Sequence, residues 1–158
     1  MITLERIMRV TGRRQTNYTC PVCRSYCQTP CLGTPDDILR LLEAGYAAKL
    51  TLTYWAVGML IGVMKTPIAM VQLIMRPEGC ILFRDGLCEL HTRGLKPTEG
   101  RLAHHILTEE NLSFRKSLSW NVARERIRKE NEPLIQKIFE QLAEFRYRSR
   151  IAENRQLL

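Results

Sequence analysis

Apolar residues recur at helical spacing in several parts of the chain, most regularly in residues 35–44 and 134–145. Ahead of the first segment, Thr34 is a suitable N-cap and Pro35 suits the first helical position. Gly45 suits the residue after the helix end, because glycine adopts a left-handed backbone without steric cost. The pattern therefore predicts helices over both segments.

The most apolar stretch, residues 50–75, predicts buried strand structure. Pro67 divides it, and the run 68–75 is typical of a buried strand. The run 54–64 leaves two interpretations open, a strand or a loop with a helical turn. Glycines interrupt that run, and a membrane-spanning helix needs about 20 apolar residues, so we expect no membrane segment here.

Two weaker helical patterns follow. A helix over residues 101–110 would carry His104 and His105, and only one of these adjacent side chains would face a neighbouring site. A further helix would begin at Trp120, with Ser119 as its cap.

Asp85-Gly86 is a tight-turn dipeptide between two short apolar runs, and it predicts a β-hairpin. We expect this hairpin to present Cys80 and Cys88 near its open end. Together the elements predict an α+β fold with a small sheet, a loop block pinned by metal and four or five surrounding helices. We expect residues 1–111 to form a cysteine-cluster metal-binding domain and residues 112–158 a basic helical extension packed on it.

Four of the six cysteines lie between Cys20 and Cys31, at the spacing C-x2-C-x3-C-x3-C. Thiolates bind zinc and other soft or borderline metals, and residues three or four apart share one side of a helical turn. Structural disulfides are an alternative that requires an oxidising compartment. An iron–sulfur cluster is another, although the ferredoxin run C-x2-C-x2-C-x3-C has a shorter middle gap. The predicted ligands, for zinc first and iron second, are Cys20, Cys23, Cys27, Cys31, Cys80 and Cys88, with His91 added because it follows Cys88 as C-x2-H.

Three blocks of the sequence resemble the CxxCxxCC cysteine-cluster family, YkgJ-like proteins described as zinc- or iron-chelating domains. They are the cysteine run, the helix start Thr34-Pro35-Asp36-Asp37-Ile38, and the stretch from Gly79-Cys80 to His91 followed by Lys96-Pro97, where the family often has Arg-Pro. The resemblance covers Cys20 to Arg101, about half of the chain.

Two features depart from the family pattern. The family's run often ends in adjacent cysteines, and a further cysteine often follows Arg-Pro, where this chain has Gly100. The resemblance implies a metal chelator without an assigned activity. It also implies that His91, His104 or His105 replaces the missing ligand, or that the site holds fewer ions.

The net charge of +8 is unevenly distributed along the chain. Residues 112–158 contain eleven basic and six acidic side chains, so the predicted C-terminal helices carry much of the excess. This surplus indicates either a nucleic-acid contact, which would be electrostatic and sensitive to salt, or a solvated basic helix face.

Three functions are consistent with the sequence. The first is a metal-binding protein of unassigned role, the second an iron–sulfur or redox protein that uses the same cysteines, and the third a zinc-ordered module that binds nucleic acid or protein. We assign no catalytic residue, because the sequence has no nucleotide-binding glycine loop, nucleophile–base pair or carboxylate dyad. Because no signal peptide is recognisable, we expect a cytoplasmic protein with reduced thiols. The sequence does not predict an oligomeric state.

Overall fold

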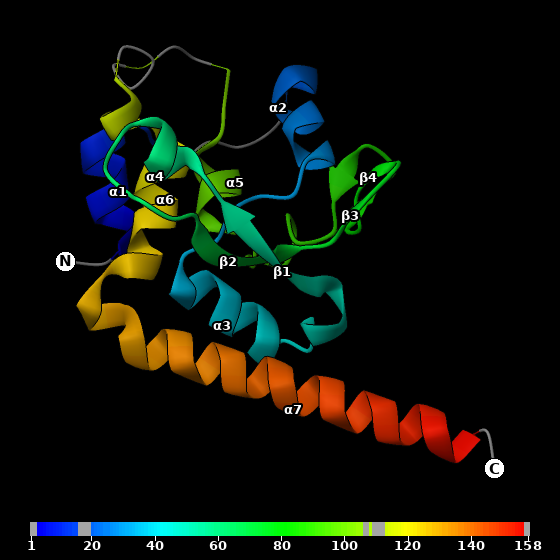
Figure 1. The fold of residues 1–158 in the computed structure, drawn as a ribbon. Coiled ribbons are helices and arrows are strands. Elements are labelled where there is room, and N and C mark those ends of the chain that lie inside the picture. Colours follow the sequence, from blue (N-terminus) through cyan, green and yellow to red (C-terminus); the bar gives the residue numbers. More distant parts are fainter. Residues whose placement is uncertain (1–2, 16–19, 106–107, 109–112, 157–158) are drawn as a thin grey trace.

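The computed structural model describes residues 3–15, 20–105, 108 and 113–156 and has the α+β fold that the sequence predicts (Figure 1). Its α-helices are α1 (Thr3–Thr11), α2 (Pro21–Ser25), α3 (Pro35–Glu43), α4 (Val57–Leu60), α5 (Thr98–Leu102), α6 (Leu118–Arg124) and α7 (Glu132–Gln156). Its strands are β1 (Leu50–Trp55), β2 (Ile68–Leu73), β3 (Met75–Arg76), β4 (Gly79–Cys80), β5 (Phe83–Arg84) and β6 (Leu87–Cys88). No helix in these ranges is both long and apolar enough to cross a membrane.

The described strands form three separate antiparallel pairs. The largest pair joins β1 to β2, with Leu50 opposite Leu73 and Trp55 opposite Ile68. Strand β2 confirms the predicted strand after Pro67. The ambiguous run 54–64 contains both alternatives, since it begins at the end of β1 and continues into the single helical turn of α4.

The predicted hairpin exists, but the prediction that it carries both later cysteines is wrong. Asp85 and Gly86 have φ values of 52° and 80°, as a type I′ turn requires, and they connect β5 to β6. Cys88 lies opposite Phe83 in this hairpin, whereas Cys80 lies opposite Met75 in the preceding hairpin, β3–β4. Residues 77–78 form a turn of their own, so two short hairpins follow one another.

Helix α3 confirms its predicted start and end. The Thr34 side chain accepts a hydrogen bond from the Asp37 amide at 3.3 Å, and the Asp37 carboxylate accepts one from the Thr34 amide at 3.0 Å. This reciprocal capping box satisfies two amides that the first helical turn leaves without partners. Gly45 has a φ of 86°, which is the left-handed conformation expected after a helix end.

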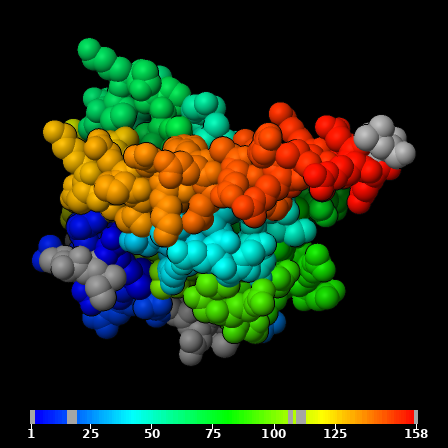
Figure 2. All heavy atoms as spheres, turned by 90° about the horizontal axis from the view of Figure 1, so that it is seen from below, coloured from blue at the N-terminus to red at the C-terminus, as the bar shows by residue number. Residues whose placement is uncertain are grey.

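Helix α7 is much longer than the predicted segment 134–145. It lies across α3, with Ile138 and Leu142 buried, and Lys137 forms an ion pair with Glu43 at 3.5 Å (Figure 2). Its C-terminal end, drawn in red, extends past α3. The domain boundary expected at residue 111 lies outside the described residues.

The predicted helix over 101–110 is wrong. Helix α5 ends at Leu102, and neither His104 nor His105 is helical, while residues 106, 107, 109 and 110 lie outside the described part. The buried Arg13 side chain donates to the carbonyls of Leu102 and His104, at 3.1 and 3.2 Å. A longer helix would need these carbonyls for its own amides, so the contact with Arg13 favours the observed end.

The predicted cap of the next helix is also wrong, by two residues. Ser117, not Ser119, accepts a hydrogen bond from the Trp120 amide, so α6 starts at Leu118. The Ser119 hydroxyl instead donates to the Glu99 carboxylate, which links α6 to α5. This tertiary partner was not visible in the local sequence.

Two apolar clusters make up the core of the described residues. One joins α3 and α7 to β2 and includes three of the cysteines: Cys27, Cys80 and Cys88. The other joins α1, α5 and α6 to the opposite side of β2. The cysteine run therefore lies against an apolar core that the helices build.

Candidate metal centre

Three potential metal ligands meet on the cysteine-run side of the molecule. The Nδ1 atom of His105 lies 3.5 Å from the Sγ atom of Cys20 and 3.3 Å from the Sγ atom of Cys23. All three ligand atoms lie within 4.8 Å of one another, and no other such group of three exists in the described part of the chain. The group could hold a metal ion.

The local sequence explains how the two sulfurs come together. Cys20 is the N-cap of α2, with an extended backbone, and its sulfur accepts a hydrogen bond from the Cys23 amide at 3.3 Å. Pro21 suits the first helical position, because it has no amide hydrogen to lose. The C-x2-C spacing therefore becomes the first turn of a short helix, with both sulfurs at its start.

The histidine comes from a segment 82 residues further along the chain. His105 follows the end of α5, where the contacts between Arg13 and the carbonyls of Leu102 and His104 fix the backbone. Arg13 thus positions the histidine-bearing segment. This role could not be predicted from the sequence, where Arg13 resembles the neighbouring basic residues Arg9 and Arg14.

The two thiols differ in their electrostatic surroundings. Hydrogen bonds from the amide and the thiol of Cys23 lower the pKa of Cys20. Burial, together with the hydrogen bond to Cys20, raises the pKa of Cys23. Cys20 therefore becomes a thiolate first and accepts hydrogen bonds from Cys23. A metal ion bound to both sulfurs would displace the thiol proton of Cys23, while the Cys23 amide could still donate to the Cys20 sulfur.

The remaining predicted ligands do not gather as closely. Cys27, Cys80 and Cys88 are buried in the core, and Cys31 is half-buried. The ammonium of Lys96 lies 3.2 Å from the Cys27 sulfur. Burial raises the pKa values of three of these thiols, that of Cys88 to about 11.

His91 lies apart from the group of Cys20, Cys23 and His105. Its amide donates to the Cys88 carbonyl at 3.0 Å, which places it just past β6. Burial lowers the pKa of its imidazole, and the charge of Lys96 adds to this effect. Its role as a ligand stays a prediction. Of the three histidines that the sequence left open, His105 is the one whose ring nitrogen lies beside two cysteine sulfurs.

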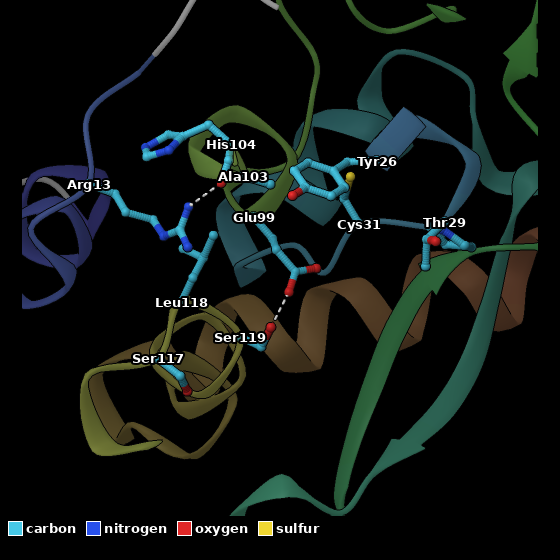
Figure 3. A pocket seen from close by; sticks show the side chains of 11 residues that line it. Arg13, Tyr26, Thr29, Cys31, Glu99, Ala103, His104, Ser117, Leu118 and Ser119 are labelled. Carbon is cyan, nitrogen blue, oxygen red and sulfur yellow. Dashed lines mark hydrogen bonds between the residues drawn. The ribbon is translucent and has the colours of Figure 1, made fainter. Parts of the chain in front are cut away.

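Cys31 is one of the residues that line a cavity of about 330 Å³ (Figure 3). Its polar lining includes Arg13, Cys31, Glu99 and His104. The two oxygens of Glu99 accept hydrogen bonds from the Leu32 amide, at 2.6 Å, and from the Ser119 hydroxyl. Glu99 therefore ties the cysteine run to α5 and α6.

Comparison of the chain with protein-family models, curated proteins and solved structures finds no match. The resemblance to the cysteine-cluster family therefore rests on the sequence motifs alone.

Proposed function

We propose that this protein binds a transition-metal ion through Cys20, Cys23 and His105, with zinc as the preferred metal and iron as the alternative. The observation that carries the proposal is the convergence of two thiols and one imidazole nitrogen from segments far apart in the sequence. Thiolate and imidazole are the ligands that zinc uses most, at about 2.3 and 2.0–2.1 Å. The resemblance to a family of metal-chelating domains supports the same conclusion.

The proposed site has three protein ligands, whereas zinc takes four in a tetrahedral shell. A water molecule, a ligand from a partner or another side chain would complete the shell. We assign no reaction to the site: Glu99, the carboxylate on the preceding helix α5, already accepts two hydrogen bonds within the fold.

Elemental analysis of protein purified without oxygen, with a visible spectrum, tests the proposal. We expect zinc and no colour in the wild-type protein, and loss of one ion in Cys23→Ser and in His105→Ala. Ser25→Ala is the control, because Ser25 lies on the same helix α2, is exposed and is outside the group. A wild-type protein without metal, or an unchanged metal content in both ligand variants, would refute the proposal. Iron with sulfide and a brown colour would replace zinc with an iron–sulfur cluster.

We also propose that the C-terminal part of α7 contacts single-stranded nucleic acid. At 100° per residue, Arg146 and Arg150 lie on one side of the exposed Tyr147, and Arg148 lies on the other. Phosphates attract such arginines, and an exposed aromatic ring offers a base a stacking surface. The buried residues of α7 are Ile138 and Leu142, so packing against the core does not explain the arginines and the tyrosine near its C-terminal end.

Fluorescence anisotropy with a labelled single-stranded RNA tests this second proposal. We expect an affinity that falls linearly with salt on logarithmic axes, and a shallower slope in Arg146→Gln/Arg150→Gln. Lys65→Gln removes an exposed cation outside α7 and is the control. Absence of binding at low salt, or equal loss in the control, would reject the contact.

A further inference from the structure

The four cysteines outside the first group belong to three neighbouring segments. Cys27 lies in the short helical turn Tyr26–Gln28, which contacts both β4 and β6. The backbones of this turn and of β4 approach each other closely, as a Cβ on Gly79 would lie only 2.8 Å from the Gln28 carbonyl oxygen. Cys80 and Cys88 are therefore held beside Cys27, and all three are at least nine-tenths buried.

Cys31 reaches the same region from the other end of the run. Its sulfur would lie only 2.5 Å from a Cβ on Gly100, and the Cε atom of Lys96 would lie 2.9 Å from the same point. The missing side chain of Gly100 thus leaves the space in which Cys31 and Lys96 meet. Any larger residue at position 100 would displace one of them.

Lys96 is the cation of this region. It is 5% exposed, and its ammonium donates to the Cys27 sulfur at 3.2 Å. It also interacts electrostatically with Cys31 and Cys88. Buried charges are stable where opposite charges lie nearby, and thiolates of these cysteines would supply negative charge beside the ammonium.

We infer that Cys27, Cys31, Cys80 and Cys88 form a second metal site, separate from that of Cys20 and Cys23, and that Lys96 balances its charge. The inference rests on the proposed function, in that thiolates of this chain bind metal. Four thiolates and one divalent ion carry a charge of −2, and the ammonium reduces this to −1. The four sulfurs move closer on binding, since each must lie about 2.3 Å from the ion.

Cobalt titration of the full reduced chain tests the inference, because thiolate-to-cobalt charge-transfer absorption grows with the number of sulfur ligands. We expect two ions in the wild-type protein. Cys20→Ser/Cys23→Ser should retain one ion and the stronger thiolate absorption, and Cys27→Ser/Cys88→Ser should retain one ion and the weaker absorption.

The two proposals fail in different ways. A single ion in the wild-type protein, lost in Cys20→Ser/Cys23→Ser, would overturn the second site and leave the first intact. A single ion retained in that variant would support the buried site and refute the first. If a cysteine variant does not fold, cadmium NMR of the wild-type chain tests the inference without it. It should give two resonances, one typical of four thiolates, and a single resonance would overturn the inference.

Lys96→Met tests the charge-balancing role. Changes in the outer shell of metal sites typically cost about 10- to 100-fold in affinity, so we expect a loss of this size at the four-cysteine site only. The exposed Lys65→Met is the control. An unchanged affinity in Lys96→Met would overturn the role of Lys96.

Discussion

Gly100 lies inside α5, where alanine would favour the helix by about 1 kcal/mol. A glycine is found here because the surrounding side chains leave no room for a Cβ atom. A Cβ at this position would lie 2.5 Å from the Cys31 sulfur and 2.9 Å from Cε of Lys96. In the cysteine-cluster family that the sequence resembles, a cysteine often stands at this position. In this chain the Cys31 side chain fills the space beside Gly100.

Gly100→Ala should lower the free energy of unfolding by about 1–3 kcal/mol, the usual cost of overpacking. Urea denaturation of the metal-free protein measures it. In a Cys31→Ala background the same change should cost much less, because the obstructing sulfur is gone. Equal costs in both backgrounds would show that the close approach of Cys31 is not the cause.

Arg126 is a second residue whose environment is unusual. It is 6% exposed, and none of its three side-chain nitrogens has a hydrogen-bond partner among the described residues. Burial lowers the pKa of its guanidinium to about 10. Because the unfolded chain holds this proton more tightly than the folded chain, Arg126 reduces stability at every pH below about 10.

Arg126→Met should therefore raise the free energy of unfolding, by about 1–3 kcal/mol at neutral pH. Urea denaturation monitored by fluorescence measures the change. Arg128→Met is the matched control and should reduce stability, because Arg128 pairs with the buried Glu125 at 3.1 Å. A loss of stability in Arg126→Met equal to that of the control would mean that the guanidinium is favourably bound.

The cysteines could be recognised from the sequence, because their spacing is local. The assignment of His105 could not be made there, since three histidines were equally available. Its position depends on the buried contact of Arg13 with Leu102 and His104, which spans about 90 residues. Which histidine approaches the cysteines depends on how distant segments pack together, and the spacing of residues along the chain does not reveal it.

At the scale of elements, Asp37 connects α3 to α5. Besides closing the capping box, its carboxylate accepts hydrogen bonds from the Thr98 amide at 2.8 Å and from Arg101 at 3.1 Å. Asp37 is 1% exposed, so its replacement would remove a buried acceptor from all of these donors at once. The sequence predicted a helix-start role for Asp37 and could not reveal its contacts with α5.

Asp37→Ala should lower the free energy of unfolding by about 3–5 kcal/mol, because it leaves the partly buried guanidinium of Arg101 and buried amides without their acceptor. Asp36→Ala, one residue earlier and exposed, should cost about 0.3–1 kcal/mol, mainly through the helix dipole, because its hydrogen bond from Thr3 is long, at 3.4 Å, and lies at the surface. Thermal unfolding of both variants gives the comparison. Similar losses in the two would mean that the contacts with α5 contribute little.

The elements differ in how far the sequence determines them. Helix α3 carries its cap, its first-turn proline and its terminal glycine within twelve residues, so its bounds were predictable. The length of helix α5 was overestimated, because Arg13 donates to carbonyls that a longer helix would use. Residues 77–79, Pro-Glu-Gly, carry a turn signal of their own, but β3 and β4 are only two residues long and show no alternating pattern, so Cys80 was assigned to the second hairpin.

At the scale of the whole molecule, the apolar core does not depend on the proposed first metal site. Helices α3 and α7 pack through Ile38, Leu41, Ile138 and Leu142, which belong to one cluster with β2. Neither Cys20 nor His105 belongs to either cluster. The metal should therefore stabilise the cysteine run without being required for the helices.

Removal of the metal by a chelator should lower the melting temperature and leave most of the helix signal in circular dichroism. At a free metal concentration of roughly 100 times the dissociation constant, binding to one site stabilises the fold by about 2.7 kcal/mol. In a chain of this size that corresponds to roughly 5–10 °C. The His105→Ala variant is the control, because its melting temperature should respond less to the same chelator. Collapse of the helix signal on chelation would show that metal is needed for the core itself, and an unchanged melting temperature would show that the folded chain has no metal to lose.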